Sequence, residues 1–319
     1  MNTTNKNQMR AVKIYQHGGA SKMSLETIAT PEPGEEEVLI KIFAAGVNPI
    51  DWKIREGHYA EIIPQTLPVT LGWDFAGEIT SLGKNVSNWN IGDAVYGRPE
   101  FSKDGTYADY IVVSVGEIAA KPKTLSWQEA AVVPLVTLTA WQALKEIGKV
   151  KQGDRVLIHA GSGGVGIAAI QIAKNAGATV YTTSTHKNAE FLKELGADEV
   201  IDYTQEDFST LENLDIVFDT IGGEVLEKSW ATLKKGGSLV SIVEVPDEDV
   251  AIKHEVHANF CFGQANFEQL SKITSLIDSG NLKVVLAYVF QLEEVAKAHE
   301  KSESGQTRGK IVIQIQEQS

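Results

Sequence analysis

The glycines of residues 161–166 have the spacing of a phosphate-binding loop. Gly161, Gly163 and Gly166 form G-x-G-x-x-G in "GSGGVG", directly after the apolar segment "RVLIHA" and at the start of an apolar helical run. The first glycine permits a tight turn, the second lets the backbone approach a pyrophosphate, and the third lets the helix pack on the strand. The positive end of the helix then faces the anion. We therefore predict a dinucleotide site with the loop residues Gly161, Ser162, Gly163, Gly164, Val165 and Gly166.

The next apolar segment ends in hydroxyl groups where a carboxylate would select NAD. "VYTTSTHKN" places Thr183 and Ser184 at its end and Lys187 just beyond. An Asp or Glu about 20 residues after the glycines would bind the ribose hydroxyls and repel a 2′-phosphate, whereas hydroxyls and an ammonium group can bind that phosphate. We therefore predict NADPH as the cofactor. The alternative interpretation of Lys187 is a solvated lysine at a helix start.

The composition limits the classes of partner. The 29 basic and 42 acidic residues give a formal charge of −13, which repels polyanions, so we expect no nucleic-acid partner. No apolar run reaches the roughly 20 residues that span a membrane, and the first ten residues lack the apolar core of a secretory signal. The single cysteine, Cys261, excludes an intrachain disulfide framework. We expect a cytoplasmic protein that needs no membrane.

The hydrophobic pattern changes once along the chain, which indicates two domains. Up to about residue 124, alternating segments such as "EVLIKIFAAGV" and "YADYIVV" are typical of a mainly antiparallel β domain. Ser126 and Glu129 then form a capping-box pattern that opens a helical run. Beyond it strands and helices alternate, as in a doubly wound parallel sheet. Helices are expected at 164–176, 188–195 and 224–233, with Gly177 and Gly196 ending the first two.

Eight segments together carry a resemblance to a known family. They are "GVNPIDWKIREGHY", "LGWDFAGEI", "GTYADYIVV", "AAVVPLVTLTAWQAL", "AGSGGVG", "LGADEVIDY", "VFDTIGG" and "SGQTRGKIVI". With them the chain resembles the medium-chain dehydrogenase/reductase superfamily, and it is most similar to the zinc-independent quinone oxidoreductases that include ζ-crystallin. The resemblance implies an α/β protein and a homodimer. It implies a GroES-like, mainly-β catalytic domain (1–124 and 266–319) and a Rossmann cofactor domain (125–265).

The resemblance also indicates that the usual metal ligands are missing. The zinc-dependent alcohol dehydrogenases of this superfamily carry a cysteine in the segment matching "GVNPIDW" and Gly-His-Glu where this chain has "GWD", residues 72–74. Asn48 or Pro49 stands at the first place and Trp73 at the second, and none of them supplies the thiolate or imidazole that zinc prefers. We therefore expect no metal there.

One other group of soft ligands lies in "KHEVHANFC". His254, His257 and Cys261 have the spacing H-x2-H-x3-C, but "HEVH" is one residue short of the H-E-x-x-H zinc motif. We interpret the segment as a polar loop followed by a core cysteine, and we expect activity that does not respond to a chelator.

Without a catalytic metal, hydride transfer is easiest to an acceptor that is already electron-poor. Zinc stabilises an alkoxide as a Lewis acid, whereas quinones and α,β-unsaturated carbonyl compounds need only orientation, hydrogen bonds and a proton after hydride transfer. In "NPIDWKIREGHY", Tyr59 matches the tyrosine that related enoyl-thioester reductases use as a proton donor. Asn48 could hold the substrate oxygen or cap a turn before Pro49, and Asp51 could orient a neighbour. For Tyr59 the alternative is a strand-edge tyrosine with a solvated hydroxyl.

The resemblance assigns further residues to the cofactor. Tyr203 and Lys187 are placed at the adenosine-phosphate end, and Thr137 on the nicotinamide side. Asp219 ends the segment "VFD" at the carboxyl edge of the sheet, where ligands bind in such folds. Arg308 is a possible phosphate partner or a plain surface arginine.

Two other functions compete with an NADPH-dependent quinone or enone reductase. A trans-2-enoyl-thioester reductase would need a basic patch for the carrier, and the sequence shows no such cluster. A low-turnover NADPH-binding protein, either crystallin-like or RNA-binding, is the third possibility, and the acidic balance disfavours RNA.

Overall fold

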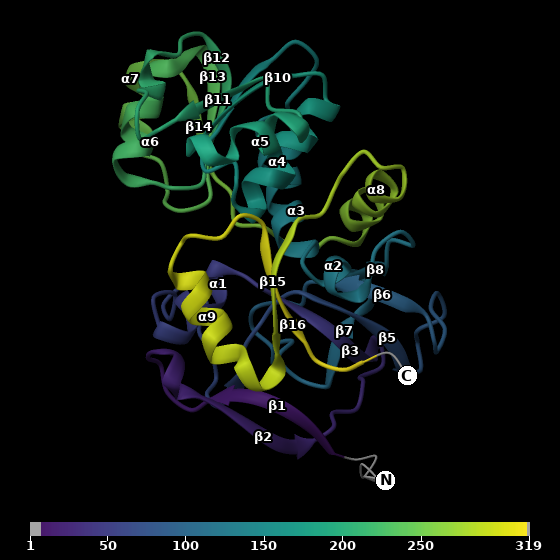
Figure 1. Ribbon diagram of the computed structural model, residues 1–319. Helices are drawn as coiled ribbons and strands as arrows, with labels where there is room; N and C mark the ends of the chain where they lie inside the picture. The colour runs from purple at the N-terminus through teal and green to yellow at the C-terminus, as the bar shows by residue number, and fades with distance from the viewer. Residues whose placement is uncertain (1–7, 318–319) are drawn as a thin grey trace. The chain divides into compact units, whose positions relative to one another are not determined.

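The chain folds into two compact units, and the structure describes residues 8–317 (Figure 1). In this computed structural model the first unit extends to Leu135 and includes Ala265–Asp278 and the chain from Val284 onward. The second unit contains Val136–Gln264 and Ser279–Lys283. The first boundary follows Leu135, whereas the sequence analysis placed it after residue 124, so the capping-box helix belongs to the first unit.

Antiparallel strands dominate the first unit. Its larger sheet has the order β15-β16-β3-β5-β6-β8, with β7 also paired to β3, and its smaller sheet has the order β2-β1-β4. Only β15 and β16 pair in parallel within these sheets, as far as residues 8–317 show. The strands are β1 (Gln8–Ile14), β2 (Met23–Ala29), β3 (Glu37–Val47), β4 (Val69–Thr70), β5 (Phe75–Leu82), β6 (Ala94–Gly97), β7 (Tyr110–Ser114), β8 (Ile118–Ala120), β15 (Leu286–Gln291) and β16 (Lys310–Gln314).

Helices of the first unit begin where the sequence supplies caps. The Ser126 hydroxyl accepts from the Glu129 N–H at 3.2 Å, and the Glu129 carboxylate accepts from the Ser126 N–H at 2.9 Å, which confirms the predicted capping box. The helices are α1 (Pro49–Glu56), α2 (Trp127–Ala131), α8 (Phe267–Asp278) and α9 (Val295–Glu303).

The second unit is the predicted parallel sheet with helical connections. Its strand order is β11-β10-β9-β12-β13-β14, and every pair in it is parallel. The order reverses beside β9, which carries the glycine loop at its end. The strands are β9 (Arg155–Ile158), β10 (Thr179–Ser184), β11 (Glu199–Asp202), β12 (Leu214–Asp219), β13 (Leu233–Ser241) and β14 (His257–Phe260).

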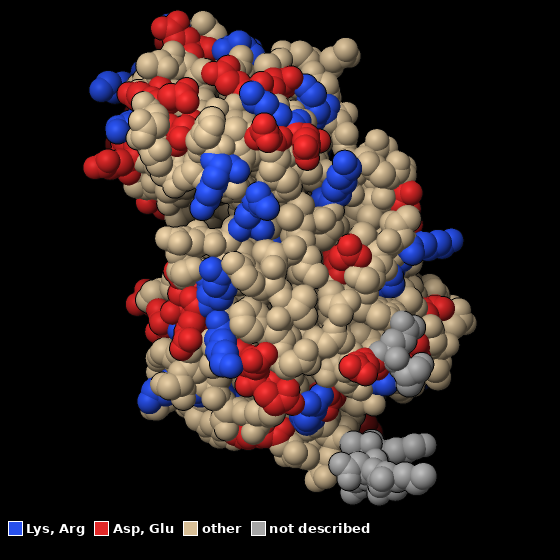
Figure 2. All heavy atoms as spheres, viewed as in Figure 1, with Lys and Arg blue, Asp and Glu red and all other residues tan. Residues whose placement is uncertain are grey.

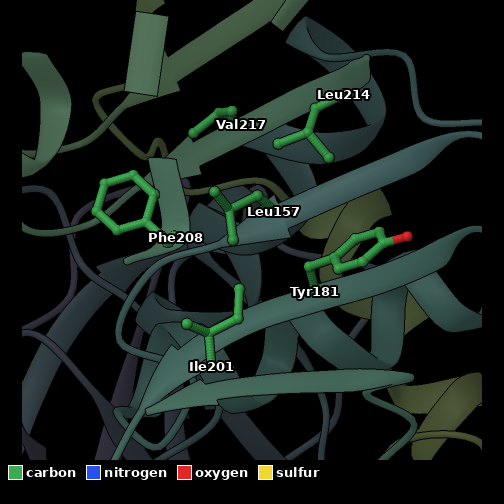
Figure 3. Packing of buried hydrophobic residues seen from close by; sticks show 6 residues of the cluster. All are labelled: Leu157, Tyr181, Ile201, Phe208, Leu214 and Val217. Carbon is green, nitrogen blue, oxygen red and sulfur yellow. The ribbon is translucent and has the colours of Figure 1, made fainter. Parts of the chain in front are cut away.

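Apolar side chains from four neighbouring strands and from the 3-10 turn Phe208–Thr210 form one core cluster of this unit (Figure 3). They are Leu157, Tyr181, Ile201, Phe208, Leu214 and Val217. The helices are α3 (Pro134–Trp141), which continues as a π-helical turn (Gln142–Ile147), α4 (Gly164–Asn175), α5 (Ala189–Glu194), α6 (Gly223–Ser229) and α7 (Glu248–His254). Gly177 and Gly196 follow α4 and α5 with φ of 84° and 111°, so both predicted C-terminal glycines are confirmed.

Two segments differ from the sequence-based prediction. The helix expected at 224–233 gives way after Ser229 to a single 3-10 turn, Trp230–Thr232, because β13 begins at Leu233. The segment interpreted as a polar loop holds the end of α7 and the edge strand β14. The Asp247 carboxylate caps α7, and Glu255, with φ of 56°, ends it.

The described residues contain no helix long and apolar enough to cross a membrane. On the face drawn in Figure 2, Lys and Arg side chains are interspersed with Asp and Glu. This mixture matches the acidic overall balance and shows no continuous basic surface on that face.

Candidate functional site

The glycine loop after β9 is tightly packed at its first and third glycines. A Cβ atom on Gly161 would lie 2.1 Å from Thr182 Oγ1, and one on Gly166 would lie 2.4 Å from the Ala160 carbonyl oxygen. Both distances are far shorter than a real contact, so these positions require glycine. The loop enters through Ala160, whose φ of 51° lies in the left-handed region.

The second glycine has open space in front of it. A Cβ atom on Gly163 would meet only the Ala160 carbonyl oxygen within 4 Å, at 3.4 Å. Gly163 is the N-cap of the twelve-residue helix α4, and no side chain of residues 8–317 caps that end. The first-turn backbone N–H groups therefore have no acceptor within the helix itself. The open position beside a helix N-terminus fits a pyrophosphate, as the fingerprint predicts.

A directional chain of hydrogen bonds supports the loop from behind. The Ala160 N–H donates to Thr183 Oγ1 at 3.1 Å, so the Thr183 proton is free for His159 Nδ1 at 3.2 Å. The Nε2–H of His159 then donates to Ser229 Oγ at 2.9 Å, and that hydroxyl donates to the Val225 carbonyl at 2.7 Å. Burial lowers the pKa of His159 to about 4, so the ring is neutral.

The residues predicted to select the cofactor phosphate fall into a buried pair at the end of β10 and an exposed pair beyond it. Thr183 and Ser184 are each 2% exposed, and their hydroxyls bond within the protein. Ser184 donates to Ser162 Oγ at 3.2 Å and so joins β10 to the loop. Lys187 is exposed, and Tyr203 is 60% exposed, with its N–H bonded to the Ser184 carbonyl at 3.3 Å. Lys187 and Tyr203 therefore present side chains to solvent at one edge of the sheet.

The other residues predicted for the cofactor differ in exposure. Asp219 is fully buried at the carboxyl end of β12, and its carboxylate accepts from two backbone N–H groups of the following turn and from the Ser241 hydroxyl at 2.7 Å. Asp219 therefore shapes the turn. Thr137 lies on α3 with 2% of its surface exposed. Arg308 is exposed in the loop before β16, in the first unit.

The first unit contains a buried polar centre at the start of α1. The Asn48 N–H donates to Asp51 Oδ2 at 2.8 Å, and the Asn48 amide donates to Asp74 Oδ2 at 2.8 Å. The Lys310 ammonium donates to Asn48 Oδ1 and, at 2.7 Å, to the Val47 carbonyl. Asn48 is thus both the N-cap of α1 and the link between a lysine and two carboxylates.

Burial shifts the proton affinities in this centre. Desolvation raises the pKa of Asp51 to about 7 and that of Asp74 to about 6, while the Lys310 ammonium opposes both shifts. Burial also lowers the pKa of Lys310 below its usual range. The two carboxylates therefore bind and release protons near neutral pH.

A second directional chain ends at Asp51. The Arg55 guanidinium can only donate, so His299 Nδ1, 3.2 Å away, accepts and the ring proton sits on Nε2. Nε2 lies 3.3 Å from the Tyr107 hydroxyl, which donates to Asp51 Oδ2 at 2.6 Å. Burial lowers the pKa of His299 to about 3, so this ring is also neutral. Each hydrogen bond of this chain is donated in the direction of Asp51. Because Asp51 is the final acceptor, it fixes the orientation of its neighbours and is a positioning residue.

Among the three predicted catalytic residues, only Tyr59 has exposed surface. Asn48 and Asp51 are 0% exposed. Tyr59 is partly exposed in the turn after α1, where its carbonyl accepts from the N–H groups of Ile62 and Ile63. The structure thus brings Asn48 and Asp51 into one network and leaves Tyr59 outside it.

Several residues of the polar centre were missed in the sequence. Asp74 and Lys310 lie in the segments "GWD" and "RGK", where a charge next to apolar strand residues is the available signal. Tyr107 and His299 carry no such signal, because their contacts join residues 56 and 192 positions apart. Within residues 8–317, no group of three or more His, Cys, Asp or Glu side chains is arranged to hold a metal ion.

Comparisons with known proteins agree with this arrangement. Residues 34–123 match the alcohol dehydrogenase GroES-like domain, and residues 195–313 match the zinc-binding dehydrogenase family. The chain is 36% identical to 2-methylene-furan-3-one reductase of Solanum lycopersicum, covering 96% of this chain and 79% of that protein. It is 34% identical to the mitochondrial NAD(P)H oxidoreductase RTN4IP1 of Mus musculus, covering 88% and 82%.

A solved structure shares nearly the whole fold. The quinone oxidoreductase from Coxiella burnetii superimposes with a TM-score of 0.89 at 40% identity, over 97% of this chain and 100% of that one. The predicted fold, a GroES-like domain with a Rossmann domain, is confirmed. The chain therefore belongs to the medium-chain dehydrogenase/reductase superfamily of oxidoreductases, in its quinone oxidoreductase branch.

Proposed function

We propose that this protein is an NADPH-dependent reductase that transfers hydride to quinones or α,β-unsaturated carbonyl compounds without a metal ion. The observation that carries the proposal is the make-up of the polar centre. Asn48, Asp51, Asp74 and Lys310 supply hydrogen-bond donors and proton-binding groups. They supply no thiolate or imidazole set of the kind that catalytic zinc uses.

The residues at the end of β10 support NADPH over NADH. The exposed Lys187 follows the end of β10, where a ribose-binding carboxylate would stand in an NAD-selective protein, and the exposed Tyr203 follows the neighbouring strand β11. An ammonium group and a phenol hydroxyl can both donate to a 2′-phosphate, and Ser162 with Ser184 holds the loop beside them. When bound, the nicotinamide supplies the hydride.

Tyr59 is the proposed proton donor. After hydride transfer, an enone holds negative charge on its oxygen and needs one proton at carbon, and a quinone needs one at oxygen. Tyr59 is the partly exposed member of the predicted set, so its hydroxyl can meet both substrate and solvent. Asn48 and Asp51 position α1, which leads to Tyr59.

The test is oxidation of NADPH and of NADH, with and without EDTA, against 1,4-benzoquinone, 9,10-phenanthrenequinone and a simple alkenal. We expect turnover that prefers NADPH and is insensitive to EDTA. Loss of activity in EDTA that returns on adding zinc would refute the metal-free part. Tight NADPH binding without turnover of any acceptor would refute the quinone and enone assignment and favour a thioester reductase or a protein with little turnover.

Location and assembly are part of the same proposal. We propose a cytoplasmic homodimer, on the grounds of the single cysteine and of the family resemblance. Light scattering coupled to size-exclusion chromatography measures the mass, and a monomeric mass would refute the dimer.

A further inference from the structure

Two nitrogen atoms of the buried Arg98 guanidinium have no hydrogen-bond partner in the described part of the chain. The residue follows β6 and is 2% exposed. Its Nε and Nη1 atoms are both buried, and neither has an acceptor within residues 8–317. By contrast, the equally buried Arg55 bonds to Glu56 and Glu303, each at 2.8 Å. The first unit thus holds two buried arginines, and only Arg55 forms an ion pair within 4 Å among residues 8–317.

Aromatic rings place the Arg98 guanidinium beside the polar centre. Its central carbon lies 4.1 Å from the centre of the Phe101 ring, and Phe101 lies 5.2 Å from the Trp73 ring. Trp73 is also fully buried, and its Nε1–H has no acceptor among the described residues. In the β5–β6 pairing Phe75 is opposite Gly97, and continuing that register sets Arg98 across from Asp74.

A buried guanidinium with two unpaired nitrogen atoms is costly to the fold. Replacing a buried charge by an apolar side chain of similar size is often neutral or stabilising. The contact with Phe101 offsets only part of the cost of taking the ion out of water. Unpaired N–H groups held at such a cost indicate an oxygen atom that the ligand-free protein does not supply.

The local charge balance indicates which kind of oxygen it is. Three carboxylates, Glu100, Asp74 and Glu117, act on Arg98 through their charges. They would repel a ligand that arrives with a full negative charge. A neutral carbonyl oxygen would not be repelled in this way, and it can take up negative charge as the reaction proceeds.

We propose that Arg98 binds the carbonyl oxygen of the acceptor and stabilises the oxyanion that forms there. This inference rests on the proposed reductase function. For an enone, hydride bonds to the β-carbon and the carbon–carbon π pair moves so that the carbonyl oxygen becomes an enolate. The Arg98 N–H donates to that oxygen. A proton from Tyr59 then adds to the α-carbon, and solvent returns the proton to Tyr59.

Binding of 4-nitrophenol to the NADP⁺-saturated protein tests this site without turnover, because its phenolate is a visible oxyanion. In the wild-type protein we expect bound nitrophenol to ionise about one pH unit lower than free nitrophenol, a tenfold shift. Arg98→Met should abolish the shift, and Arg98→Lys, which keeps the charge, should retain part of it. Lys84→Met removes an exposed charge elsewhere in the same unit and is the matched control. Equal shifts in all four proteins would overturn the proposal.

Stability and turnover give two independent readouts. Arg98→Met should unfold at the same temperature as the wild type or higher, because no internal partner is lost. Marked destabilisation of that variant would mean that Arg98 has a structural partner, and it would overturn the proposal. Arg98→Met should also lower kcat for an enone by about 10²-fold, as loss of one oxyanion donor does.

The outcomes separate this proposal from the proposed function. A nitrophenol shift that depends on Arg98, in a protein that reduces no quinone or enone, would retain the oxyanion site and refute the reductase assignment. Normal reduction of enones by the Arg98→Met variant would retain the reductase assignment and refute the oxyanion site.

Discussion

Replacing His159 by leucine tests whether the hydrogen-bonded chain behind the glycine loop holds that loop in place. Leucine is similar in size but removes the ring nitrogens that contact Thr183 Oγ1 at 3.2 Å and Ser229 Oγ at 2.9 Å. Thr183 still accepts from the Ala160 N–H, but its own proton loses its acceptor in a buried place. Leaving a buried donor unpaired costs about 1–3 kcal/mol, so near neutral pH we expect the free energy of unfolding to fall by about 2 kcal/mol.

At acidic pH the difference in unfolding free energy between this variant and the wild type should disappear. Burial lowers the pKa of His159 from 6.5 to about 4, so below pH 6.5 the unfolded chain takes up a proton that the folded chain does not. The stability associated with neutral His159 is therefore complete above pH 6.5 and declines toward pH 4. One pH unit corresponds to about 1.4 kcal/mol, so at about pH 5 the wild type has lost about 2 kcal/mol and the two proteins should be equally stable.

Urea unfolding at both pH values measures the stability, and fluorescence titration measures NADPH binding. Because His159 no longer orients the Thr183 hydroxyl that accepts from the Ala160 N–H, we expect a Kd for NADPH about tenfold higher, or 1.4 kcal/mol. His257→Leu, at an exposed histidine of the edge strand β14 in the same unit, is the control and should change neither quantity. Destabilisation with unchanged NADPH affinity would show that the chain supports the fold and not the loop. No destabilisation at neutral pH would refute the hydrogen-bond assignment itself.

Three further expectations concern the glycines, the phosphate and the proton. Gly161→Ala should lower stability by about 2 kcal/mol or more in thermal unfolding because its Cβ meets Thr182, whereas Gly163→Ala should fold normally and weaken NADPH binding about tenfold. Equal effects of the two changes would refute the assigned roles. Lys187→Glu should raise the KM for NADPH about tenfold and leave that for NADH nearly unchanged, since it replaces a phosphate donor with a repelling charge. Tyr59→Phe should lower kcat for an enone about 10²-fold at unchanged NADPH affinity, and a normal kcat would assign the proton to another donor.

The cofactor loop was predictable because its determinants are local. Gly161, Gly163 and Gly166 lie within six residues, and the strand before them and the helix after them follow from hydrophobic periodicity. The capping box at Ser126 was predictable for the same reason. The edge strand β14 was not, since four residues with alternating exposure give too weak a pattern, although Asp247 before an acidic first turn was a usable cap signal for α7.

The polar centre depends on contacts that no local pattern contains. Arg55 bonds to Glu303, 248 positions away, and Lys310 bonds to Asn48, 262 positions away. The sequence suggested Asn48 and Asp51 from a family segment, but their complete burial and their partners depend on the return of the C-terminal strand to the first unit. Local spacing identifies side chains that could take part in chemistry. Only the tertiary structure shows which of these side chains already form hydrogen bonds within the protein.

The two units differ in how completely their buried polar side chains are hydrogen-bonded, and this difference bears on where the chemistry occurs. In the second unit, the side chains of His159, Thr183 and Asp219 are hydrogen-bonded within the protein. Most buried side-chain atoms without a partner in residues 8–317 lie in the first unit, including Arg98 Nε and Asp51 Oδ1. Unpaired groups lower stability, and they persist where a bound reactant completes them. Under the proposed function, the second unit binds the cofactor, and the first unit provides the Arg98 donors for the reacting acceptor.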